Sequence, residues 1–127
     1  MSVTIIEEMI GQTFDEVSND HAVLIFSIDY SQVYRKAVFT FFHDQDCCES
    51  VWIEDITGDL SDLLESPITE AEVVTETCET DSGRQTWSFF KFGTARGCVT
   101  VRWCGESNGY YSESVSLRIE STKIINY

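Results

Sequence analysis

The chain has 127 residues, of which 43% are hydrophobic and 13% aromatic, with one Pro and seven Gly; this excludes intrinsic disorder, collagen and low-complexity sequence. No apolar run approaches the roughly 18 residues of a membrane helix, and residues 1–11 lack the basic residues of a signal peptide. The net charge of −14 argues against direct binding to nucleic acid. We therefore expect a single compact domain over residues 1–127, in a cytoplasm and away from membranes.

The first part of the chain predicts a β-hairpin. A short strand is expected at 13–17, followed by a turn at 18–20. Branched and aromatic residues fill 22–30 and 33–43, and only two polar residues separate these runs. We interpret the two runs as antiparallel strands of one hairpin.

The middle of the chain predicts the one helix. Residues 51–53 are apolar, but they are too few for periodicity to separate a strand from a helical turn. The segment 58–66 favours a helix because Asp59 suits the N-cap, three leucines share one face and Pro67 ends the pattern.

The last part of the chain predicts further strands with short connections. Imperfect alternation indicates a strand at 68–75, whereas the charged segment 76–84 has no apolar pattern and is predicted to be a mobile loop. Strands are expected at 85–92, 97–104 and 110–120. The connections are too short for crossover helices, so we expect an α+β fold of mostly antiparallel β-sheet, with about seven strands and one short helix.

The negative charge is concentrated in one interval. No Lys or Arg occurs between Lys36 and Arg84. This interval admits three interpretations: a solvated face, a surface that imitates DNA phosphates, and a cation site, although its first acids lack the spacing of a Ca²⁺ loop. Its acidic residues are more than half of the 22 in the chain: Asp44, Asp46, Glu49, Glu54, Asp55, Asp59, Asp62, Glu65, Glu70, Glu72, Glu76, Glu79 and Asp81.

The cysteines and motifs indicate no cofactor, metal or catalytic centre. An odd count of five Cys predicts reduced thiols that act as small buried hydrophobes, and the adjacent Cys47 and Cys48 are not expected to pair. With His43 they lack the spacing of a zinc site. Phosphate-loop, dinucleotide and serine-hydrolase motifs are absent, which argues against an enzyme, although His and Glu residues alone can support phosphodiester chemistry.

Basic and aromatic residues are interleaved in the C-terminal half. On a sheet, aromatic rings can stack on a nucleotide base, basic side chains can bind its phosphate, and amide groups can hydrogen-bond to the polar edges of the base or ribose. Alternatively, many of these rings fill the core. Arg102 alternates away from an apolar strand face, and only one of Tyr110 and Tyr111 can point inward. The residues predicted to bind a small nucleotide-type ligand are Arg102, Trp103, Asn108, Tyr110, Tyr111, His43 and Trp52.

Two motifs carry a resemblance to a known family. They are DCCESVWIEDI at 46–56 and ESNGYYSESV at 106–115. Over about residues 9–119 the chain resembles small uncharacterised bacteriophage proteins that form a domain of unknown function. The resemblance implies a phage origin and the cytoplasm of a bacterial host, and it implies no activity. The chain departs from the pattern at Cys104, where many members have Tyr.

Small phage proteins without catalytic motifs often counter host defence, which suggests two functions. The first is sequestration of a nucleotide-derived immune signal, in a pocket that a homo-oligomer would complete at a subunit interface. The alternative is an acidic inhibitor that imitates DNA and binds a host nuclease or another DNA-binding defence protein through residues 44–81. Apolar residues within the acidic interval, such as Trp52 and Leu63, favour the first function.

Overall fold

The computed structural model describes residues 5–30, 35–109, 111–119 and 123–127. These residues form nine strands and two short 3-10 helices, η1 (Ile5–Met9) and η3 (Leu60–Leu63). Branched and aromatic residues dominate the strands at 23–30, 35–42 and 50–57, as expected for pleated surfaces that are half buried. The strands are β1 (Glu16–Asn19), β2 (Val23–Tyr30), β3 (Arg35–Phe42), β4 (Ser50–Thr57), β5 (Glu70–Thr80), β6 (Gly83–Thr94), β7 (Gly97–Ser107), β8 (Ser116–Ile119) and β9 (Lys123–Asn126).

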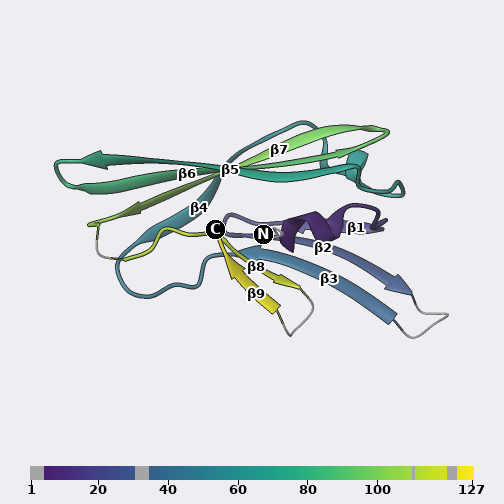
Figure 1. Cartoon of the computed structure of the whole chain (residues 1–127), viewed down its shortest axis with the longest axis horizontal. Helices are drawn as coiled ribbons and strands as arrows, with labels where there is room; N and C mark the ends of the chain where they lie inside the picture. The colour runs from purple at the N-terminus through teal and green to yellow at the C-terminus, as the bar shows by residue number, and fades with distance from the viewer. Residues whose placement is uncertain (1–4, 31–34, 110, 120–122) are drawn as a thin grey trace.

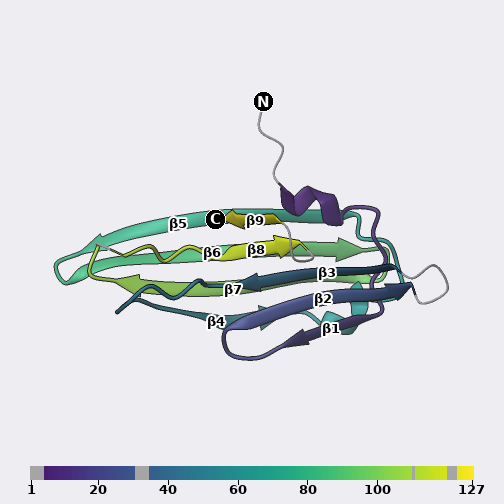
Figure 2. The same cartoon turned by 90° about the horizontal axis from the view of Figure 1, so that it is seen from below.

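The strands form two antiparallel sheets that stack face to face (Figure 1). The five-stranded sheet has the order β1-β2-β3-β8-β9, and the four-stranded sheet has the order β4-β7-β6-β5. In the second sheet β5, β6 and β7 are consecutive and lie side by side (Figure 2). Each sheet therefore has an inner face toward its partner and an outer face away from it.

Phenylalanine rings from both sheets fill the space between them. Phe26 of β2 lies 5.0 Å from Phe92 of β6, and Phe41 of β3 lies 5.1 Å from Phe90, measured between ring centroids. Phe14 adds a ring 5.5 Å from Phe26. All five side chains are at most 1% exposed. Their tilted and edge-on contacts stabilise the core beyond the burial of their area.

The predicted hairpin is confirmed. Residues 23–30 of β2 pair with residues 42–35 of β3 in antiparallel register. The tight connection predicted at 31–32 lies outside the described residues. The strand expected at 13–17 begins later, at Glu16.

The helix predicted at 58–66 is wrong. Asp59 caps as expected, because its Oδ1 accepts a hydrogen bond of 3.0 Å from the Ser61 amide, but only the single 3-10 turn η3 follows. Gly58 and Glu65 have φ values of 104° and 61°, in the left-handed region, so the backbone leaves helical geometry on both sides of this turn. The mostly antiparallel β prediction is confirmed, whereas within the described residues the helical part is limited to 3-10 turns. None of these helical segments has the length and apolar character to cross a membrane.

The mobile loop predicted at 76–84 is also wrong. Most of this segment is strand: β5 continues to Thr80, and β6 begins at Gly83 after a two-residue turn. Residues 76–80 are exposed, so both faces of this part of the hairpin carry mostly polar side chains and no apolar alternation marks it as a strand.

The C-terminal strands differ from prediction mainly in number. Val99, Val101 and Trp103 of β7 are buried on one face, as the alternation predicts. The expected strand at 110–120 is shorter, since β8 covers only four residues, and the pattern did not predict β9. The structure therefore contains nine strands within the described residues in place of about seven.

Candidate functional site

Two loops meet at one end of the sandwich through His43. Its Nδ1 lies 2.6 Å from the backbone oxygen of Ser114, and its Nε2 lies 2.7 Å from Oε2 of Glu49. Both neighbours are acceptors, so both contacts are hydrogen bonds only when each ring nitrogen carries a hydrogen. The two motifs behind the family resemblance therefore approach each other here. We call this region, residues 43–50, 80–86, 106–109 and 111–114, the polar end.

Glu49 closes the first of these loops. It is 3% exposed and accepts hydrogen bonds of 2.9 Å from the backbone N–H groups of Cys47 and Asp46. The Cys47 amide, with the His43 and Asp46 contacts, lowers the pKa of Glu49 to about 2 against the opposing effect of burial. Such a stabilised carboxylate is a weak base at neutral pH, so Glu49 organises the loop and is poorly suited to proton transfer.

Glu113 holds the second loop against β6 and β7. Its carboxylate, in a residue 4% exposed, accepts two hydrogen bonds of 2.7 Å from Arg84, one of 2.9 Å from Thr86 and one of 3.0 Å from Ser107. The Arg84 guanidinium is the main cause of the lowered pKa of Glu113, and Glu113 in turn raises the pKa of Arg84. A Cβ on Gly105 would lie 2.5 Å from the Glu113 Cβ, so glycine permits this close approach.

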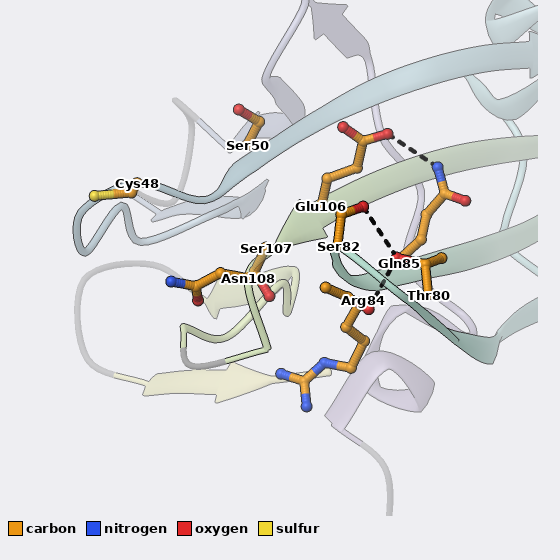
Figure 3. Close-up of a pocket in the computed structure, with 10 residues that line it drawn as sticks. Cys48, Ser50, Thr80, Ser82, Arg84, Gln85, Glu106, Ser107 and Asn108 are labelled. Carbon is orange, nitrogen blue, oxygen red and sulfur yellow. Dashed lines mark hydrogen bonds between the residues drawn. The ribbon is translucent and has the colours of Figure 1, made fainter.

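An open cleft of about 410 Å³ lies at the polar end, between the β5–β6 turn and the loop after β7 (Figure 3). Its described lining includes Asn108, Ser82 and Gln85, and Gln85 donates a hydrogen bond of 3.0 Å to Glu106. The volume is within the usual range for small ligands. The lining is polar and small, and Arg84 is already paired with Glu113, so the cleft suits a small polar molecule better than a stacked base.

The residues predicted to bind a nucleotide do not share this cleft. Asn108 lines it. Trp103 is 1% exposed within the core, because alternation along β7 directs it inward beside Val101; its assignment as a ligand contact is corrected on this ground. Arg102 and Trp52 lie on the opposite, outer side of the same sheet.

Of the other three predicted residues, His43 and Tyr111 lie at the polar end. His43 is engaged between Glu49 and Ser114. The backbone oxygen of Tyr111 accepts a hydrogen bond of 3.3 Å from Arg84. Tyr110 lies outside the described residues. No single described pocket combines the predicted set, and nucleotide binding stays a prediction.

A second group of aromatic side chains lies on the outer face of the four-stranded sheet. Directly opposed residues of antiparallel strands point to the same side, so the register aligns Trp52, Cys104 and Trp87 in one row. The next row contains Arg102, Phe89 and Val74. The Arg102 Cζ lies 5.3 Å from the Trp87 ring centroid, and Val74 is 43% exposed.

Carboxylates flank these rows on both edge strands. On β4, Glu54 accepts a hydrogen bond of 2.6 Å from the Trp52 indole. On β5, Glu72 lies 3.9 Å from the Lys91 ammonium of the neighbouring strand. No described element packs over this side of the sheet (Figure 1). We define the outer face as Trp52, Glu54, Asp55, Glu70, Glu72, Val74, Glu76, Gln85, Trp87, Phe89, Lys91, Arg102, Cys104 and Glu106.

The sequence contained a signal for this face. Trp87 and Phe89 alternate with the buried Ser88 and Phe90, so one strand carries rings on both of its faces. The sequence interpretation left Trp87 and Phe89 outside the predicted site, and it combined Trp103 with Arg102 although the two alternate along one strand.

The cysteine prediction requires correction. Cys104 is buried, and burial raises the pKa of its thiol, but Cys78 and Cys98 are exposed. Cys47 and Cys48 are joined by a disulfide, contrary to expectation, in the exposed loop that Glu49 closes. Within the described part of the chain, no group of three or more His, Cys, Asp or Glu side chains is arranged to hold a metal ion.

The protein is therefore an antiparallel β-sandwich in which one acidic sheet face has no described element packed over it. Residues 7–117 match the family described as Domain of unknown function (DUF7448), and the chain belongs to this family. Neither the curated proteins nor the solved structures contain a match to the chain. The expected membership of an uncharacterised domain family is therefore confirmed, and function has to be argued from the surfaces.

Proposed function

We propose that the protein binds a basic DNA-binding protein through the outer face and competes with DNA for it. The supporting observation is that carboxylates on both edge strands, among them Glu54 and Glu72, flank an uncovered aromatic strip. Such a surface attracts the Lys- and Arg-rich site that normally contacts phosphates. The resemblance to phage proteins makes a bacterial nuclease or restriction enzyme the proposed target.

The cations described on the sheet support a basic partner over an anionic one. Arg84 is paired with Glu113, Arg102 stacks on Trp87, and Lys91 faces Glu72. An anionic ligand would meet these engaged cations inside a field set by the net charge of −14.

Displacement of labelled DNA from purified nucleases and restriction enzymes tests the proposal. We expect the protein to displace DNA from at least one enzyme, with an affinity that falls steeply as salt increases. Replacing Glu72 and Glu76 with Gln should weaken displacement about tenfold or more, because it removes charge from the outer face.

The matched control removes the same charge elsewhere. Asp15, just before β1, and Glu16, the first residue of this strand of the other sheet, are exposed, and their Asn and Gln variants should displace DNA like the parent protein. Failure to displace DNA from any enzyme, or equal losses in the two variants, would overturn the proposal.

Sequestration of a nucleotide-derived signal is the second candidate, and the cleft of about 410 Å³ supports it. Thermal melting against cyclic nucleotides and cyclic ADP-ribose isomers tests it, since a ligand at 100 times its Kd adds about 2.7 kcal/mol. Asn108→Ala should remove the shift. Recovery of an altered ligand would indicate an enzyme, and no shift with any ligand would exclude this candidate.

A further inference from the structure

We propose that the element bound on the outer face is a basic amphipathic α-helix, lying along β6 and β7. This inference rests on the proposed function, because it names the part of the basic partner that the face receives. The relevant feature is the arrangement of side chains on this face: Glu54, Asp55, Glu70, Glu72 and Glu76 lie on the two edge strands, and β6 and β7 between them carry the Trp87 and Phe89 rings together with Lys91, Arg102 and Glu106.

The width of the strip matches one helix. Three inter-strand intervals separate β4 from β5, and at about 4.8 Å each they place the two edges roughly 14 Å apart. An α-helix with side chains is about 10–12 Å across. The major groove of DNA, about 12 Å wide between two rows of phosphates, admits a helix for the same reason.

The length of the strip also fits a helix. On β5, Glu70, Glu72 and Glu76 share the outer side and span six residue steps, which is about 20 Å of extended strand. A helix covers that distance in about 13 residues. Lys or Arg residues four apart on a helix are separated by about 6 Å along its axis, close to the roughly 6.7 Å between Glu70 and Glu72.

The floor of the strip has the chemistry to hold an amphipathic face. Phe89 and the 43%-exposed Val74 offer apolar contact, whereas the Trp52 and Trp87 rings offer surfaces on which arginine can stack. Trp87 already stacks with Arg102 of this chain in that way. A helix with apolar residues in its centre and cations on both flanks would contact the Phe89 and Val74 side chains and the carboxylates of both edge strands together.

The charge pattern disfavours other occupants. A second copy would bring its own carboxylates at Glu54, Glu72 and Glu76 against those of the first. Nucleic acid and anionic lipid surfaces would meet the same repulsion. A positively charged segment lacks this cost, which commits the proposal to a basic partner.

Two peptides of about 18 residues provide the test, each roughly 27 Å long as a helix. The first places Leu and Ala along a central stripe with Lys and Arg on both flanks, and a side-chain crosslink holds it helical. The second has the same composition, charge and crosslink, but its order is scrambled so that the stripe is lost. Fluorescence anisotropy at physiological salt measures the binding of each to the full chain.

We expect the amphipathic helix to bind at least about tenfold more tightly than the scrambled peptide, because apolar contact adds to charge. The Glu72→Gln/Glu76→Gln variant and, separately, Phe89→Ser should each reduce its affinity, whereas Asp15→Asn/Glu16→Gln should not. Circular dichroism melting of each variant establishes that it is folded.

The outcomes separate this inference from the proposed function. Equal binding of the two peptides, with DNA displacement still observed, overturns the helix and retains a basic partner held by charge alone. Binding that survives both outer-face variants also overturns it, because the helix would then lie elsewhere. Absence of both peptide binding and DNA displacement overturns the inference and the proposed function together.

Discussion

The inner and outer faces of the four-stranded sheet are both aromatic, but among the described residues only the inner face is covered. On β6 the neighbours Phe89 and Phe90 point to opposite sides: Phe90 is fully buried against Phe41, whereas Phe89 lies partly exposed beside Val74. The inner face forms part of the hydrophobic core between the two sheets. The second face keeps its rings without a described covering element, which is typical of an interaction surface.

Substitution of the two phenylalanines provides the largest test of this comparison. Phe90→Ala should lower the free energy of unfolding by about 3–5 kcal/mol, because it leaves a cavity between the sheets. Phe89→Ala should cost less than about 1 kcal/mol, since its side chain already contacts solvent. Urea denaturation measures both values. Similar costs for the two variants would mean that the outer rings are structural, and would weaken the case for a binding face.

Gly105 and Glu106 extend the comparison along β7. Gly105→Ala should destabilise the protein by about 1–3 kcal/mol, because the new methyl group would lie 2.5 Å from the Glu113 Cβ. Glu106→Ala, on the outer face, should change the free energy of unfolding by no more than about 0.5 kcal/mol. A Gly105→Ala protein as stable as its parent would show that the Glu113 loop packs less closely than described.

The last comparison, for which we expect the smallest effect, is between the hydrogen-bonded carboxylate of Glu49 and the exposed carboxylate of Glu72. The pKa of Glu49, about 2, is below its unfolded value, so its ionised form stabilises the fold at neutral pH. This contribution should decline as pH falls from about 5 toward 2. Glu49→Gln should therefore be less stable than the parent at pH 7, and the difference should shrink in acid.

Denaturation at several pH values measures this trend, and Glu72→Gln is the matched control. Glu72 is exposed and has only a 3.9 Å contact to Lys91, so we expect Glu72→Gln to leave the free energy of unfolding at pH 7 nearly unchanged. An unchanged profile for Glu49→Gln would contradict the role assigned to the loop hydrogen bonds.

Alternation along the chain predicted most of the strands correctly because each strand has one face in the core. It failed where that condition is absent. Residues 76–80 of β5 are exposed on both faces, and η3 carries leucines at helical spacing although Gly58 and Glu65 interrupt the helix. The four-residue strand β9 is too short for a pattern.

The sequence predicted the components of the candidate site better than their arrangement. Arg102 and Trp52 were selected as ligand contacts and do lie on one accessible face. Trp103 was grouped with them, although its parity along β7 places it in the core. The sequence also marked the acidic interval, but only the strand order shows that its residues occupy both edges of one sheet.

The pairing of β3 with β8 has a consequence for synthesis of the protein. Phe39 pairs with Ile119, so its partner strand leaves the ribosome several seconds later at roughly 5–20 residues per second. The hairpins of β5, β6 and β7 are local and can form during that interval. The strand with Phe39 and Phe41 meanwhile exposes an unpaired apolar edge to other nascent chains. A chaperone that shields this edge during the interval should therefore raise the soluble yield.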